Sequence, residues 1–197
     1  MHARRNGPQI LDFGVSGALW RDAMVMFDRQ SGSYWSHVTG KCIEGMLRGS
    51  QLERIEAVLM PFAEWARAHP ESRVVVREPG MQGASRYQSY VESTRLGIFG
   101  AQAKRAELAP KAIVQGIAVG GEAAAVSHEA LRARTTLEFD LGGKRFLARY
   151  ERGAVTVWER RRVGKGKDAP ERLVAWPTTT AFWFAWTNFY PRSDVIR

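Results

Sequence analysis

The chain has 197 residues, of which 45% are apolar and 25% are charged, a composition typical of a folded globular protein. It carries 29 Lys and Arg residues against 20 Asp and Glu residues, which gives a net charge of +9. No apolar stretch approaches the roughly 18 residues needed to cross a bilayer, and one cysteine excludes both an internal disulfide and a zinc site made only of cysteines. We therefore expect a cytoplasmic globular chain without a membrane span.

Short apolar runs separated by close turns predict an antiparallel meander at the start of the chain, with strands at 9–15, 23–28 and 34–38. A helix is expected at 60–69, because Pro61 suits a first turn and Pro70 ends the helix. The valines that follow predict a strand at 73–77. Residues 79–100 are interpreted as a long loop with at most a short turn at 87–91.

A second β-rich section is expected from residue 112 onward. Strands at 113–119 and 123–126 flank Gly120 and Gly121, which suit a tight hairpin turn. Ser127 is expected to cap a helix at 128–133. Further strands are expected at 135–141, 144–150 and 154–158, then a basic loop, then an aromatic helix at 179–189 that stops at Pro191.

Most of the excess charge lies in one place, since residues 144–172 carry a net charge of +6. The densest group is Arg160, Arg161, Arg162, Lys165 and Lys167, interrupted by glycines. This pattern is typical of a solvated loop, and a weak anion contact is the next interpretation. Nucleic-acid binding through the basic loop is a third hypothesis, which we rank lowest because no base-reading side chains accompany the charges.

A short internal repeat joins the two parts of the chain. Trp65 is followed by a ring residue, a proline, a serine and a β-branched pair, and Trp186 is followed by the same types at the same spacing. A helix that proline ends and that leads into a strand explains the pattern physically. We expect two tandem related units, residues 1–100 ending in this helix–proline–strand corner and residues 101–197 carrying the basic loop and the aromatic helix.

Three segments resemble a known family. Phe-Gly-Val-Ser-Gly-Ala-Leu-Trp occupies 13–20, Met-Phe-Asp-Arg-Gln-Ser-Gly-Ser-Tyr-Trp-Ser occupies 26–36, and Thr-Gly-Lys-Cys-Ile-Glu-Gly occupies 39–45. Together they resemble the prokaryotic domain-of-unknown-function 3179 family, as do Trp65 with His69-Pro70 and the segments around Gly116 and Gly120. The resemblance runs from about residue 9 to the C-terminus and implies a mixed, β-rich fold and a bacterial protein, without an established reaction.

The sequence departs from the family pattern at its start. In relatives a further β-rich segment with a Cys-Pro-x-Cys motif precedes the Phe-Gly-Val-Ser-Gly strand, and this sequence does not contain it. We expect either a short form of the family or a true start upstream, and in the second case a cell-envelope or exported protein.

His37 and Cys42 form the best local cluster for chemistry, because a Gly40 turn between them would let the side chains meet. The pair could serve as base and nucleophile, or as two ligands of a metal. No orienting partner or oxyanion donor pair is visible, so structural roles are the main interpretation. A metal- or thiol-dependent enzyme remains the alternative, no metal site is assigned, and the cofactor is unknown.

Aromatic side chains suggest a binding groove between the two units. We expect Trp20, Tyr34, Trp35 and Trp65 to line it, with basic residues attracting a small anionic ligand or a protein partner. The leading hypothesis is therefore a non-catalytic binding module, with enzymatic activity left open.

The aromatic helix at 179–189 is apolar nearly all round, which favours burial between two sheets, with a homodimer interface as the alternative. The overall expectation is an α+β fold of short antiparallel strands with two or three helices, arranged as tandem related units.

Overall fold

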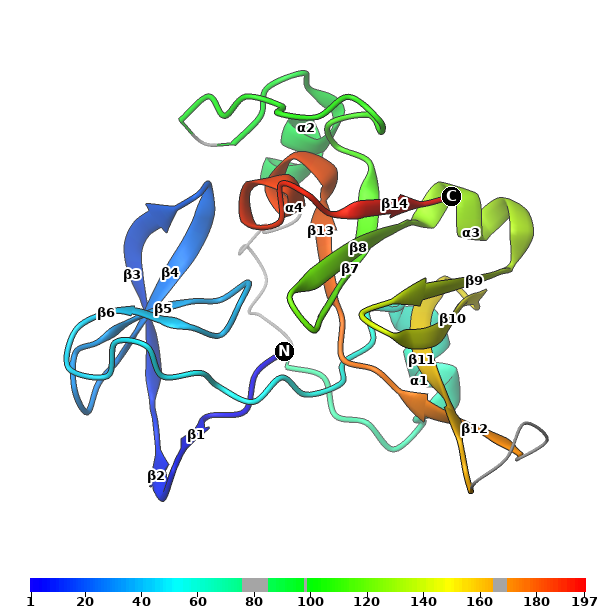
Figure 1. Ribbon diagram of the computed structural model, residues 1–197. Coiled ribbons are helices and arrows are strands. Elements are labelled where there is room, and N and C mark those ends of the chain that lie inside the picture. Colours follow the sequence, from blue (N-terminus) through cyan, green and yellow to red (C-terminus); the bar gives the residue numbers. More distant parts are fainter. Residues whose placement is uncertain (76–84, 98, 165–169) are drawn as a thin grey trace.

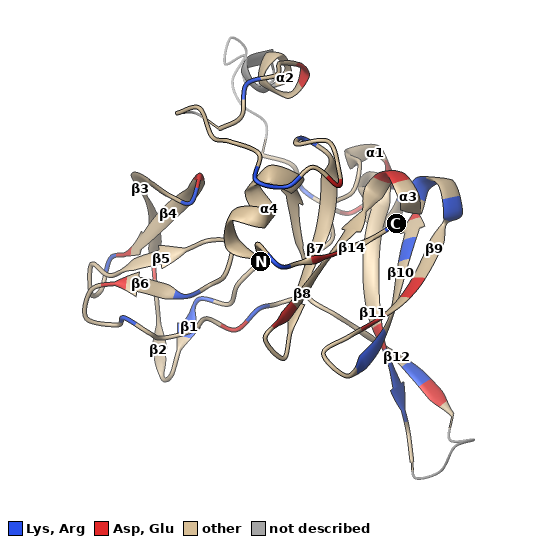
Figure 2. Cartoon of the chain, turned by 45° about the horizontal axis from the view of Figure 1, so that its top comes forward, with Lys and Arg blue, Asp and Glu red and all other residues tan. Residues whose placement is uncertain are grey.

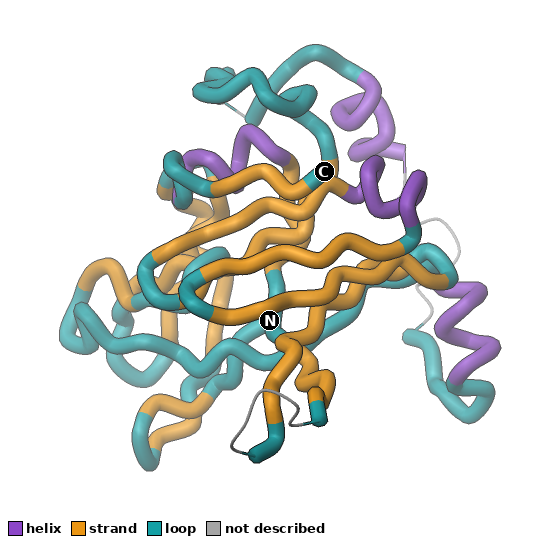
Figure 3. The backbone as a smooth tube through the Cα atoms, turned by 45° about the vertical axis from the view of Figure 1, so that its right-hand side comes forward, coloured by secondary structure: helices purple, strands orange, loops and turns teal. Residues whose placement is uncertain are grey.

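The computed structural model describes residues 1–75, 85–97, 99–164 and 170–197, and every structural statement below concerns these residues. Short strands are the main regular element, and the helices are only two turns long (Figures 1 and 3). The predicted α+β, β-rich class is confirmed. The structure has four helices in the described ranges, where two or three were expected.

The first half contains a small hairpin, one four-stranded antiparallel sheet and two helices. The hairpin pairs β1 with β2, and the sheet has the order β3-β4-β5-β6. The bounds are β1 Arg5–Asn6, β2 Gln9–Ile10, β3 Phe13–Trp20, β4 Ala23–Asp28, β5 Tyr34–Ser36, β6 Cys42–Glu44, α1 Phe62–Ala68 and α2 Ser85–Glu92.

Two expectations for the first half were wrong. Residues 85–92 form helix α2 where only a short turn was predicted, and residues 73–75 form no strand, while 76–77 lie outside the described residues. Val75 is 95% exposed, and residues 73–75 pair with no strand among the described residues. β propensity alone does not make a strand when the backbone hydrogen bonds have no partner.

The turn between β3 and β4 consists of Arg21 and Asp22, both with positive φ, 53° and 61°. Two consecutive left-handed residues define a type I′ turn, whose twist matches that of the flanking strands. Gly120 and Gly121 form the same turn between β7 and β8, as their sequence predicted.

The second half contains two four-stranded sheets, in the orders β12-β11-β10-β9 and β13-β7-β8-β14. Strand β14 pairs parallel with β8, and the other pairs are antiparallel. The bounds are β7 Ile113–Val119, β8 Glu122–Ser127, α3 His128–Arg134, β9 Thr136–Leu141, β10 Lys144–Glu151, β11 Ala154–Arg162, β12 Glu171–Ala175, β13 Thr179–Phe182, α4 Trp183–Phe189 and β14 Asp194–Ile196.

Several local predictions for the second half are confirmed, and two boundaries are corrected. Ser127 caps α3 by accepting a hydrogen bond from the backbone of Ala130 at 3.3 Å. Residues 179–182, predicted as the start of the aromatic helix, instead form β13 and pair with β7. Arg160, Arg161 and Arg162 belong to β11 and pair with β12 rather than lying in a loop.

Helix α4 lies between the β3–β6 sheet and the β7–β8 hairpin (Figure 1). Its rings Trp183, Phe184 and Trp186 are buried, in agreement with the expectation of a helix between two sheets. At its C-terminal end, the side chain of Asn188 donates to Asp22 Oδ2 at 2.9 Å and Phe189 packs edge-on against Trp20. A homodimer through this helix stays a prediction, and these buried rings are not free surface for it.

The two repeated segments fold alike. We call residues 62–75 the Trp65 corner and residues 183–196 the Trp186 corner. In each, the indole nitrogen of the tryptophan donates to the serine seven residues later, at 3.1 Å and 2.8 Å. In each, the tryptophan packs on the ring four residues later, with centroids 4.1 Å and 4.2 Å apart. The division of the chain into tandem units near residue 100 stays a prediction that this likeness supports.

Candidate functional site

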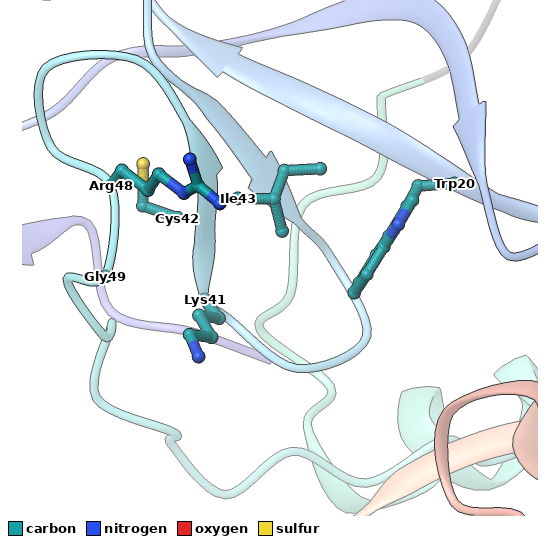
Figure 4. A pocket seen from close by; sticks show the side chains of 6 residues that line it. All are labelled: Trp20, Lys41, Cys42, Ile43, Arg48 and Gly49. Carbon is teal, nitrogen blue, oxygen red and sulfur yellow. The ribbon is translucent and has the colours of Figure 1, made fainter.

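A hollow of about 380 Å³ opens beside β6 and the end of β3 (Figure 4). Trp20 lies on one side, and the side chains on the opposite side come from β6 and the segments next to it. The described residues that line it are Trp20, Lys41, Cys42, Ile43, Arg48 and Gly49. Of the predicted groove residues, only Trp20 lines this hollow.

The hollow has a positive rim. Lys41 and Arg48 are both exposed, and within the described residues neither forms an ion pair. A third cation is close, because the Arg21 guanidinium carbon lies 4.8 Å from the centroid of the Trp20 ring. None of the six lining residues is acidic, so the field at the opening favours an anion.

The structure does not bring the four predicted aromatic residues together. Trp35 is fully buried, with its indole nitrogen 2.8 Å from a carboxylate oxygen of Asp28. Tyr34 is exposed on β5, and Trp65 is exposed on α1 beside His69. Only Trp20 stands over a hollow with basic neighbours.

Asp28 is the centre of a buried polar network. Its carboxylate accepts hydrogen bonds from the Trp35 indole and from both the backbone and the hydroxyl of Ser31, at 2.6–2.8 Å. Burial alone would raise the pKa of Asp28, but these bonds together with a backbone bond from Ser33 hold it below its ordinary value. The Asp-x-x-Ser spacing was the available signal, since it is typical of a side-chain-closed turn.

Cys42 lines the hollow, but its thiol is poorly placed for chemistry. The residue is 1% exposed, and its Sγ lies 3.4 Å from the backbone oxygen of Glu44, to which it donates. The sulfur points away from Trp20 (Figure 4). Burial raises the pKa of the thiol, so the reactive thiolate is scarce at neutral pH.

His37 lies on a different cavity from Cys42. Its Nδ1 donates to the backbone oxygen of Met24 at 2.7 Å. It lines a cleft of about 670 Å³ between the two halves, together with His2, Asp22 and Phe182. The predicted pair therefore lines two different cavities, whose described lining residues have no member in common.

A family model confirms the family resemblance that the sequence motifs suggested. The model described as protein of unknown function (DUF3179) matches residues 2–193. The chain belongs to the DUF3179 family. No curated protein and no solved structure matches it.

Two arginines of the basic cluster of this DUF3179 protein form ion pairs with acids. Arg160 forms ion pairs with Glu138 and Glu171, and Arg161 pairs with Glu159 at 2.6 Å. Basic and acidic positions lie side by side on β9–β12 (Figure 2). Lys165 and Lys167 lie outside the described residues. The site role expected for the five basic residues stays a prediction.

Glu159 is the buried member of this cluster. Its carboxylate accepts from Arg161 and, at 2.6 Å, from Lys144. The bond from Arg161 lowers the pKa of Glu159, burial opposes it, and Lys144 lowers it further. These charges hold neighbouring strands together rather than facing a ligand as a free group.

Two general features of the family member follow from the described residues. None of its helices is long and apolar enough to cross a membrane. Within the same residues, no three side chains of His, Cys, Asp or Glu gather in the way that holds a metal ion. The compartment stays a prediction.

Proposed function

We propose that this DUF3179 protein is a non-catalytic binding module that takes a small anion with a flat apolar part in the hollow beside Trp20. The observation that carries the proposal is the pairing of one aromatic face with two cations that have no ion-pair partner among the described residues, Lys41 and Arg48. An aromatic carboxylate fits this chemistry, because its ring can lie on the indole while its charge faces the basic rim.

The surroundings support binding more than catalysis. Ile43 adds apolar surface, and burial raises the pKa of the Cys42 thiol, which favours its protonated, unreactive form. The cations are exposed, so each contributes weakly in water and their joint attraction falls with salt. We expect a weak, salt-dependent site whose selectivity comes from charge and a flat ring together.

The test is a titration of the labelled protein with benzoate, followed by chemical shifts of the Trp20 indole and the amides of residues 41–49. Benzamide keeps the ring without the charge, and acetate keeps the charge without the ring. We expect benzoate to bind best, and Arg48→Gln or Lys41→Gln to weaken it about three- to tenfold. Arg152→Gln is the matched control, because Arg152 is an exposed cation elsewhere in the chain.

Two results would contradict this proposal. If benzamide shifts the same signals as strongly as benzoate, the basic rim has no role in recognition. If Arg48→Gln and Lys41→Gln bind benzoate as well as Arg152→Gln does, the ligand lies elsewhere.

The alternative of a metal- or thiol-dependent enzyme is tested on the same sample. Protein purified without an affinity tag would contain stoichiometric zinc, copper or iron, and His37→Ala would lose it. The separation of His37 and Cys42 into two cavities weighs against that alternative. Nucleic-acid binding through the basic residues ranks third, because Arg160 and Arg161 already face acids.

A further inference from the structure

We propose that the Trp65 corner is a docking face for a β-hairpin of a partner polypeptide, one with a glycine under the indole and a free outer strand. The proposal rests on the contrast between the two corners of this chain. They share their internal geometry, but only the Trp186 corner has a partner surface among the described residues.

The Trp186 corner shows what such a face packs against. Its indole lies on the backbone of Gly116 in β7, where an added Cβ would come within 2.2 Å of the ring. Only glycine allows this close approach of backbone and ring. The chain then continues into β14, which pairs parallel with β8 through Val195 opposite Ala125. Helix α4, the Trp186 indole and strand β14 thus all pack on the β7–β8 hairpin.

The Trp65 corner carries the same groups without the hairpin. Trp65 and Trp186 are 121 positions apart, and at this offset Phe62 corresponds to Trp183 and Val74 to Val195. Helix α1 has no buried residue, and Phe62, Trp65 and Val74 are exposed by 62%, 42% and 55%. An aromatic and aliphatic strip of this kind is unusual on an isolated surface and typical of an interaction site.

The corner is held in place while its rings stay accessible. Pro61, at the start of α1, lies against Gly153 in the turn between β10 and β11. Figure 1 shows α1 beside β10 and β11, on the far side of the molecule from the β3–β6 sheet. The hydrogen bond from Trp65 to Ser72 keeps the corner in its docked shape. A partner would therefore meet a pre-organised face, which lowers the entropic cost of binding.

The hairpin β7–β8 of a second copy does not suit as the occupant. Both of its edges are already paired, with β13 on one side and β14 on the other. The occupant must bring its own free strand edge, with small apolar residues like Ala124 and Ala125 beside the added strand. A glycine-bearing hairpin from another polypeptide meets both requirements, and backbone pairing would supply much of its affinity.

The probe is a cyclised peptide with the sequence of residues 113–127, which reproduces the β7–β8 hairpin and leaves its edges free. We expect saturable shifts of the Trp65 indole and slower amide exchange at Val74 and Val75. Trp65→Ala should weaken binding about tenfold or more. Phe99→Ala is the matched control, since it removes an aromatic ring that is 82% exposed elsewhere. A peptide with Gly116→Val should fail to bind, because the valine side chain would occupy the space in which the indole packs.

Unchanged thermal unfolding of Trp65→Ala would show that the variant folds. The proposal is overturned if the glycine and valine peptides bind equally, or if Trp65→Ala binds as well as Phe99→Ala. It is also overturned if the protein alone self-associates and Trp65→Ala abolishes that association, because the occupant would then be a second copy.

Discussion

The indole of Trp35 donates to the carboxylate of Asp28 at 2.8 Å, and both residues are fully buried. This bond ties β5 to the last residue of β4, and Trp35 packs in the apolar cluster with Leu11, Cys42 and Leu52. A charged group inside a small core is tolerated because Trp35 and Ser31 donate to its oxygens.

Asp28→Asn is expected to lower the free energy of unfolding by about 2 kcal/mol, since bonds to a buried charged acceptor contribute about that much. The amide cannot accept from Trp35 and Ser31 at both of its ends. Chemical denaturation measures the change. Asp12→Asn is the control, because Asp12 is exposed and its bonds with Arg4 and Gln30 lie at the surface. A loss no larger than that of the control would contradict the central role of Asp28.

The same carboxylate predicts acid sensitivity. The folded-state pKa of Asp28 is lowered, so its stabilising contribution is present above the unfolded-state pKa of about 4. The contribution is lost as the pH falls through the lower folded-state pKa. Asp28→Asn should therefore show a shallower decrease of stability below about pH 4 than the wild type. Parallel stability curves for the two proteins would refute this.

Gly116→Ala should destabilise the second half, because its Cβ would overlap the Trp186 ring. We expect a loss of about 1–3 kcal/mol, the usual cost of overfilling a packed core. The melting temperature measures the loss. The double variant Gly116→Ala/Trp186→Leu should lose less than the sum of the single variants, since the smaller side chain makes room. Simple additivity would show that the two positions do not share a contact.

The contact between the halves can be measured by a double-mutant cycle on Asp22 and Asn188. The Asn188 amide donates to Asp22 Oδ2 at 2.9 Å, and each single change to alanine should cost about 1 kcal/mol. The double variant should lose clearly less than the sum, because both changes remove the same bond. Urea unfolding followed by tryptophan fluorescence gives the values. A coupling near zero would mean that the bond does not stabilise the interface.

Cys42 should react slowly with a thiol reagent in the native protein. Its 1% exposure and raised pKa both reduce the accessible thiolate. We expect the native rate to be more than about tenfold below the rate in urea, which serves as the internal control because the chain has one cysteine. A fast native reaction would revive the thiol-enzyme alternative.

Sequence patterns predicted those parts of the fold that depend on neighbours along the chain. Gly120 and Gly121 form the predicted hairpin turn, and Ser127 caps the predicted helix. Prolines end both corner helices, as their position before a serine and a branched pair suggested. The family resemblance was also visible in local motifs, and the family model that confirms it matches residues 2–193.

The candidate site could not be assembled from the sequence. Trp20, Tyr34, Trp35 and Trp65 carry the same aromatic signal, but one lies at a hollow, one is buried and two are exposed in different places. No sequence pattern marked Lys41 and Arg48 as site residues, because exposed cations are common in any sequence. Only the folded chain places them opposite Trp20. His37 and Cys42 are close in the chain, but a tight turn between them changes the direction of the chain. They therefore line different cavities.

By itself, the sequence determined the family, the β-rich class and the proline-ended helix that the two corners share. Only the tertiary structure decided that the Trp186 corner is covered and the Trp65 corner is exposed. The reason is physical: turns, caps and helix ends are settled by hydrogen bonds between near neighbours. Whether a corner is buried depends on a strand far away in the sequence that offers a glycine and a free edge. Packing across the whole molecule decides whether such a strand lies beside the corner.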